Sequence, residues 1–268
     1  MAAIAPFLQS VKLPVMPEVG IALIRTLNDE NADVPMVRNV ISKDPALTAT
    51  LLRMANSAIF GLSRSVTTLD AAVSVVGMSQ IRARALSICM ANAFALPATL
   101  NRLDFWRNSM VRAGYAKWLA ASIKMDENEA WLTAMMLRLG EIVIAQHSAS
   151  MIDSIEKRPS APGERWSRER DAAGFDEGQI MQELAQRWDF PEVVCKALGA
   201  SAQPLSVIPF NSLGTVVHLA SLLADQASTS PTILDALPLD VVEMLGLNMS
   251  ALQKDLPDPD SFSDISMI

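Results

Sequence analysis

The sequence is poor in the side chains from which most metal centres and nucleophilic active sites are built. Its 268 residues include two histidines, two cysteines and one tyrosine. A hydrolytic metal centre needs several His and carboxylate side chains that converge on the ion. A disulfide framework needs more cysteines than Cys89 and Cys195. The composition therefore argues against both and favours a reducing, cytoplasmic compartment.

Positive charge is also in short supply. Lys and Arg together number 22 against 29 Asp and Glu, so the formal net charge is −7. A nucleic-acid-binding protein needs a basic surface, and so does a protein that docks on an anionic membrane. No apolar run approaches the ~18 residues of a membrane span, and the first residues lack the pattern of a signal peptide. We therefore expect neither a nucleic-acid nor a membrane partner.

What the sequence has in abundance is helical periodicity. Half of its residues are hydrophobic, and they recur at helical spacing, as at Val19, Leu23 and Leu27. Asp33 and Asp44 each precede a proline-containing first turn, which is typical of helix starts. No stretch shows the alternation of a strand. The pattern predicts an all-α protein.

The helices are expected to fall into two lobes that meet near residue 100. Residues 1–100 would form the first lobe, and residues 101–226 the second, in which helices 102–124 and 127–148 form an antiparallel pair. Residues 227–268 would be an extension, and its end from residue 255, "DLPDPDSFSDISMI", is Pro-, Ser- and Asp-rich. We interpret that end as a disordered acidic tail.

Three segments resemble the HDOD domains (HD-related output domains), a bacterial signalling family. The first contains "LPVMP", "SKDPAL" and "LLRMANSAIFGL", the second is "VTTLDAAVSVVGMSQIRARAL", and the third is "FDEGQIMQELAQRWDFPEVVCKAL". The resemblance covers roughly residues 10–225. It implies a two-lobe helical fold similar to that of the HD-GYP phosphodiesterases, whose catalytic ligands HDOD domains generally lack.

The resemblance also indicates where the metal ligands of the catalytic relatives would fall. Leu137 and Arg138 stand at two of these positions. Leucine donates no ligand atom, and arginine carries a permanent positive charge that repels a cation. The resemblance therefore implies a degenerate site with no metal, no cofactor and no catalytic residue, and a protein that is not an enzyme. The former ligand positions are Asn108, Leu137, Arg138, Glu177, Ser201, Ala202 and Ser221.

Arg138 carries the sharpest expectation about this vacated site. An unpaired guanidinium is costly to bury, and Glu177 occupies a former ligand position that should face the same centre. We therefore expect a buried Arg138–Glu177 salt bridge, with Asn108 able to accept from the same guanidinium. The alternative is a solvent-exposed pair with Glu141, one helical turn after Arg138.

Two functions remain open at this stage. The first is a non-catalytic signalling module that transmits a bacterial signal by binding another protein. The second is a receptor whose degenerate pocket binds a nucleotide such as cyclic di-GMP, with Arg107 and Arg138 attracting phosphate. Most isolated polar residues on these helices have plain structural roles. The candidate contacts for a partner or an anion are Arg53, Asn56, Arg82, Arg84 and Arg107.

Overall fold

The computed structural model describes residues 4–57, 65–156, 161–226 and 231–262. Within these ranges the chain folds into α-helices and short 3₁₀ helices, with no strand. The prediction of an all-α protein is confirmed. None of the helices in these ranges has the length and apolarity needed to cross a membrane.

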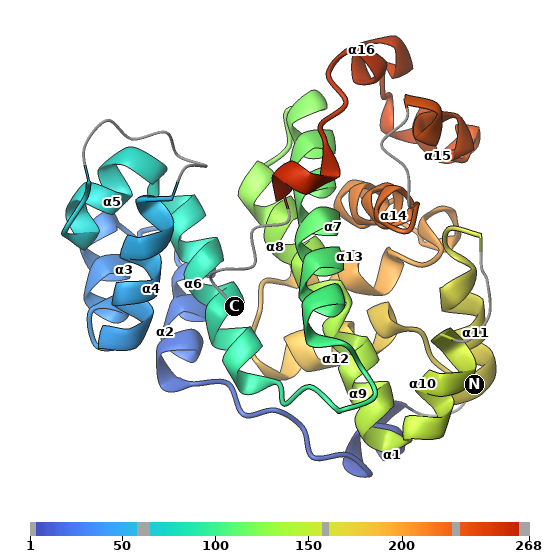
Figure 1. The fold of residues 1–268 in the computed structure, drawn as a ribbon, viewed down its shortest axis with the longest axis horizontal. Coiled ribbons are helices and arrows are strands. Elements are labelled where there is room, and N and C mark those ends of the chain that lie inside the picture. The colour runs from blue at the N-terminus through green and yellow to red at the C-terminus, as the bar shows by residue number, and fades with distance from the viewer. Residues whose placement is uncertain (1–3, 58–64, 157–160, 227–230, 263–268) are drawn as a thin grey trace. The chain divides into compact units, whose positions relative to one another are not determined.

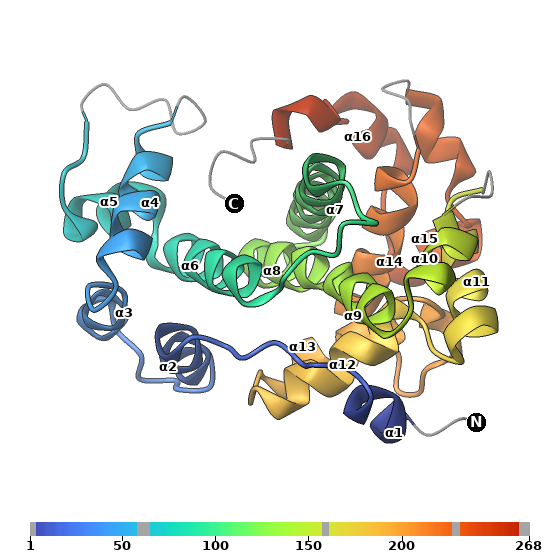
Figure 2. The ribbon, with the colours of Figure 1, turned by 60° about the horizontal axis from the view of Figure 1, so that its bottom comes forward.

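Contacts divide the described chain into two units, of which the smaller comprises residues 14–94 and 187–191. Its helix α6 packs against α2, α3, α4 and α5 (Figure 2). The expected caps are present, because Asp33 accepts from the backbone N–H of Met36 at 2.8 Å and Asp44 accepts from that of Leu47 at 3.0 Å. The helices are α2 (Glu18–Leu27), α3 (Val34–Ile41), α4 (Pro45–Ala55), α5 (Leu69–Val76) and α6 (Met78–Ala93).

The larger unit is built around α7 (Arg102–Ser122), which packs against α8 and α14 (Figure 1). Buried residues occur on every side of α7, as expected of a helix enclosed by its neighbours. The other helices are α1 (Ile4–Gln9), α8 (Glu127–Leu137), α9 (Leu139–His147), α10 (Ala149–Glu156), α11 (Glu164–Ala173), α12 (Glu177–Arg187), α13 (Glu192–Ala200), η2 (Pro204–Ser206), α14 (Ser212–Ala224), η3 (Pro231–Ala236), α15 (Leu239–Leu245), α16 (Met249–Lys254) and η4 (Pro259–Phe262).

The helix predicted over 127–148 is interrupted at one residue. Helix α8 ends at Leu137 and α9 begins at Leu139, with Arg138 between them at φ −67° and ψ −12°. The interruption precedes a close approach of α9 to α12. A Cβ atom added to Gly140 would lie 2.3 Å from the backbone oxygen of Glu177, so glycine is needed where the two helices meet.

Of the expected disordered tail, residues 255–262 belong to the described structure and residues 263–268 lie outside the described residues. Residues 255–262 are placed, and η4 packs on α7, where the Phe262 and Tyr115 rings lie 5.5 Å apart. The acidic, proline-rich composition of this segment did not indicate that Phe262 would bind it to α7. The larger unit also includes α1 and the helices after residue 230, so contacts do not divide the chain at residues 100 and 226.

We predict that Gly140→Ala lowers the free energy of unfolding by roughly 1–3 kcal/mol, because backbone atoms of α12 cannot move away from the added methyl group. Gly199→Ala in α13 is the matched control. Its added Cβ would meet the end of the Gln182 side chain, which can rotate away, so the change should stay within about 1 kcal/mol. Urea unfolding of both variants measures the difference, and equal stabilities would contradict the prediction.

Candidate functional site

The larger unit buries Asp176 and a further set of five ionisable side chains. They come from four helices that are far apart in the sequence, and burying such charges is costly unless each is paired. The three glutamates are 0% exposed, and the two arginines are 1% and 8% exposed. We call this set the ionic cluster: Arg112 of α7, Glu141 of α9, Arg165 and Glu169 of α11, and Glu177 of α12.

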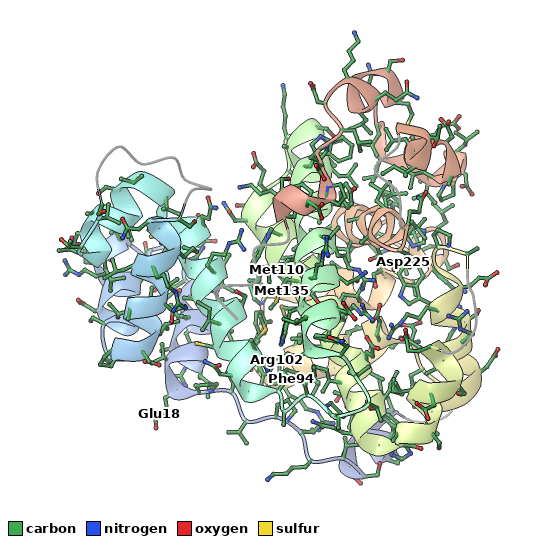
Figure 3. The ribbon with its side chains drawn as sticks, viewed as in Figure 1. Glu18, Phe94, Arg102, Met110, Met135 and Asp225 are labelled. Carbon is green, nitrogen blue, oxygen red and sulfur yellow. The ribbon has the colours of Figure 1, made fainter. Side chains whose placement is uncertain are left out.

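Arg112 connects three helices. One guanidinium nitrogen, Nη1, lies 3.2 Å from Oε1 of Glu177, and Nη2 lies 3.2 Å from Oδ1 of Asp225. Asp225, labelled in Figure 3, follows α14. Its side chain is 23% exposed. The Arg112 guanidinium therefore ties α7 to the start of α12 and to the end of α14.

Arg165 is the most heavily paired residue of the cluster. Its Nε lies 2.8 Å from Oε1 of Glu169, and its Nη2 lies 2.9 Å from Oε2 of Glu141. Nη1 lies 2.7 Å from the more exposed Glu156, and Nη2 is also 3.8 Å from Glu177. One guanidinium thus neutralises carboxylates of α9, α10, α11 and α12.

Glu177 also forms hydrogen bonds with groups other than the arginines. The indole Nε1 of Trp166 donates to its Oε1 at 3.1 Å, and its own backbone N–H donates to Oε2 of Glu169 at 2.8 Å. The Trp166 ring stacks on His218 with 5.0 Å between ring centroids. These contacts hold Glu177 in one position at the first turn of α12.

The surroundings shift the pKa values of two of these glutamates in opposite directions. Burial acts to raise the pKa of Glu141, but the nearby charges of Arg138 and Arg165 and their hydrogen bonds outweigh it, so the pKa is lowered. Burial also raises the pKa of Glu169, to about 8, because Arg165 only partly offsets it and the charge of Glu177 adds to it. The raised pKa favours the protonated form of Glu169 near neutral pH.

Arg138 does not pair with Glu177, so the expected bridge across the former metal position is wrong. Its Nη2 and Nε lie 2.7 and 2.8 Å from Oε2 of Glu141, and its guanidinium carbon lies 5.4 Å from the centre of the Phe105 ring. The pair is nevertheless not the exposed alternative, because Glu141 is 0% and Arg138 13% exposed. Glu177 is instead bound by Arg112, whose side chain reaches it from α7.

The remaining former ligand positions have ordinary structural contacts. Leu137 is fully buried in the apolar core, and Ala202 is half-buried. Asn108 donates to the backbone oxygen of Ala224 at 3.4 Å. The hydroxyls of the two serines donate to nearby backbone carbonyls at 2.7 Å, Ser201, just after α13, to Leu198 and Ser221, within α14, to Val217.

Three of the five candidate contact residues have partners within their own unit. Arg82 donates to the backbone oxygen of Thr26 at 2.8 Å, which joins α6 to the end of α2. Asn56 exchanges two hydrogen bonds with the backbone of Val66, and Arg107 forms an ion pair with Asp260. Arg53, which is exposed, and Arg84, which is half-buried, also take part in contacts.

The sequence contained signals for the residues that were missed. Arg112 lies four positions after Asn108, which places both on one face of α7. Arg165 and Glu169 are an i,i+4 pair on α11, with Trp166 beside them. Because α11 is rich in charged residues, its sequence resembles a solvated surface helix, and only the tertiary contacts reveal that this face is buried.

The ionic cluster is better suited to hold its own charges than to hold a metal ion. Over the described ranges, no group of three or more His, Cys, Asp or Glu side chains is arranged to bind a metal. The carboxylates that come closest to one another already face Arg112 or Arg165. A cation would have to compete with guanidinium groups that are covalently part of the chain.

The helical fold and this buried centre define an HD-like all-α domain. Residues 13–204, most of the chain, match the family model of the HDOD domain. The chain therefore belongs to the HDOD domain family.

Solved structures with this fold include three bacterial proteins. A protein from Shewanella amazonensis SB2B, provisionally named a phosphohydrolase, is 23% identical with a TM-score of 0.79 and covers 98% of this chain and 96% of its own. A protein from Marinobacter aquaeolei VT8, provisionally named a signal transduction protein, is 21% identical with a TM-score of 0.81, covering 100% of this chain and 61% of its own. An HDOD domain protein of unknown function from Geobacter sulfurreducens is 18% identical with a TM-score of 0.78, and covers 98% and 96% of the two chains.

A curated relative from Treponema pallidum (strain Nichols), an uncharacterized protein, is 24% identical over 192 residues. The match covers 69% of this chain and 37% of the relative. The chain thus spans little more than a third of that relative's length.

We predict that Arg112→Ala lowers the free energy of unfolding by about 3–5 kcal/mol, because Glu177 would remain buried without its arginine. Lys117→Ala on the same helix is the matched control, since Lys117 forms a partly exposed pair with Glu127 at 3.8 Å, worth about 0–1 kcal/mol. Chemical denaturation measures both variants. An Arg112→Ala protein as stable as Lys117→Ala would show that the cluster contributes little to folding.

The protonated Glu169 predicts a pH dependence of stability. Its folded-state pKa is raised above the ordinary 4.5, to about 8, so the folded state binds more protons than the unfolded state within that window. Its contribution is fully present below pH 4.5 and is lost as the pH rises through about 8. The free energy of unfolding of the wild type should therefore fall across this window relative to that of Glu169→Gln.

Denaturation series at several pH values measure this difference. Glu164→Gln, an exposed position on the same helix, is the control and should retain the wild-type pH profile. A Glu169→Gln profile parallel to the wild type would contradict the assignment of the buried proton.

Proposed function

We propose that this chain is a non-catalytic signalling module that acts by binding another protein. The observation that carries the proposal is the pairing of the buried carboxylates with arginine. Glu141, Glu169 and Glu177 each contact Arg112 or Arg165, so the centre of the larger unit is neutralised by fixed charges. Membership of the HDOD domain family, together with the name of the Marinobacter relative, supports a role in signalling.

His218, Cys89 and Cys195 are poor candidates for catalytic groups. Burial lowers the pKa of His218, and its Nδ1 lies 2.7 Å from the backbone oxygen of Ser201, so the ring is neutral and engaged. Burial raises the pKa of the Cys89 and Cys195 thiols to about 11, so thiolates are scarce at neutral pH. The surroundings of His218 and of the two cysteines therefore give no support to a hydrolase.

The contacts also favour a protein partner over a nucleotide. The two arginines expected to attract phosphate already have carboxylate partners, Glu141 for Arg138 and Asp260 for Arg107. A phosphate would have to displace a carboxylate from each of them. A receptor for cyclic di-GMP thus becomes an outcome of the test below.

We predict that the purified protein hydrolyses neither cyclic di-GMP nor bis-p-nitrophenyl phosphate in the presence of Mg²⁺ or Mn²⁺. Calorimetric titration with cyclic di-GMP should show no binding heat, because Arg107 and Arg138 already pair with Asp260 and Glu141. A catalytic HD-GYP phosphodiesterase is the positive control for both assays. Turnover that scales with protein concentration and disappears in Glu177→Gln would refute the non-catalytic assignment, and saturable heat would favour the nucleotide receptor.

A further inference from the structure

A short segment late in the chain lies across the central helix of the larger unit. The 3₁₀ helix η4 packs on α7 (red on green in Figure 1; Figure 2 shows the same pairing from another side). It contacts α7 through two side chains, Asp260 and Phe262. We call residues 258–262 the strap.

The α7 surface under the strap is shaped for an aromatic ring. A Cβ atom added to Gly114 would have the Phe262 ring as its three nearest neighbours, the closest atom 2.2 Å away. The Tyr115 ring meets Phe262 edge-on, with 5.5 Å between centroids. The ring therefore fits only because position 114 lacks a side chain.

A cation completes this surface. Arg107 lies seven residues before Gly114, two helical turns along the same face, and it forms an ion pair with Asp260. We call Arg107, Gly114 and Tyr115 the α7 seat. An acidic residue two positions before an aromatic ring matches the seat in both charge and shape.

The strap is held by contacts that can exchange with solvent. The side chains of Arg107 and Asp260 are 58% and 67% exposed, so salt and water screen their attraction. Phe262 is only half-buried. The strap's own turn is formed locally, since Asp258 accepts from the backbone N–H of Asp260 at 2.9 Å and that of Ser261 at 3.0 Å. Local hydrogen bonds therefore contribute to the shape of the strap.

We propose that the α7 seat is the docking surface for a partner protein segment that carries an acidic residue two positions before an aromatic ring, and that the strap competes with this segment for the seat. The proposal rests on the proposed function, because it names the surface and the partner chemistry for a module that binds another protein. Release of Phe262 and Asp260 exposes an aromatic slot beside a cation. A partner segment of the same chemistry replaces both contacts at once.

The test uses the full chain and a labelled peptide with the sequence of residues 255–262, DLPDPDSF, as a probe of partner chemistry. Phe262→Ala empties the aromatic slot, and Asp260→Lys, a second opening variant, removes the ion pair. Fluorescence anisotropy should show saturable binding to both variants and at least tenfold weaker binding to the wild type. No binding to either opened variant, or equal binding to all three proteins, would overturn the proposal.

Two further variants show whether the probe binds at the seat. Gly114→Ala added to Phe262→Ala should abolish binding, because the new methyl group fills the slot. Arg107→Glu added to Phe262→Ala should also abolish it, and a peptide with Lys in place of the acidic residue matching Asp260 should restore it. Binding that persists with the filled slot, or a charge swap that does not restore it, places the probe elsewhere and overturns the proposal.

The thermal unfolding temperature of each variant controls for loss of the fold. Failure of peptide binding leaves the hydrolysis and calorimetry results of the proposed function unchanged, so the two proposals can fail separately.

Discussion

The ion pairs of the Glu177 carboxylate with Arg112 and Arg165 constrain how the helices of the larger unit pack. Glu177 is fully buried, and it receives Arg112 at 3.2 Å, Trp166 at 3.1 Å and the more distant Arg165 at 3.8 Å. A buried charge tolerates little displacement, since each lost partner leaves an uncompensated group away from water. The helices that carry these residues, α7, α11 and α12, must therefore keep one relative placement.

The close approach of α9 to α12 follows from the same constraint. Gly140 lets the backbone at Glu177 come within the space that a side chain would occupy, and this brings Glu141 within reach of Arg165 at 2.9 Å. In the proposed function, guanidinium groups take the place that metal ions occupy in hydrolytic relatives. Such charges cannot dissociate, and they cannot activate a water molecule as a bound metal does. Under the proposed function, the fold is retained and the protein acts through its surface.

Helix α7 carries residues of both the ionic cluster and the α7 seat. One face carries Arg112, which belongs to the ionic cluster, and the opposite face, which η4 covers, carries Arg107 and Gly114, which form the seat with Tyr115. The cluster makes α7 a rigid support, so a segment docking on its outer face meets a preformed surface. Because the slot for the aromatic ring and the neighbouring cation are already in place, less conformational entropy is lost when a segment binds.

Local sequence determined the helical class, the caps at Asp33 and Asp44 and the family resemblance, because these depend on neighbours within a turn or on motif spacing. Which charges meet was decided by the tertiary structure. The sequence named Arg138 as the partner of Glu177, whereas the fold pairs Arg138 with Glu141 and places Arg112 on Glu177. Helical periodicity tells which residues share a face, but partners on different helices depend on how the helices pack. For the same reason the sequence predicts a disordered tail where the structure has the strap. The Phe262 ring is held in space left by Gly114, almost 150 residues earlier in the chain.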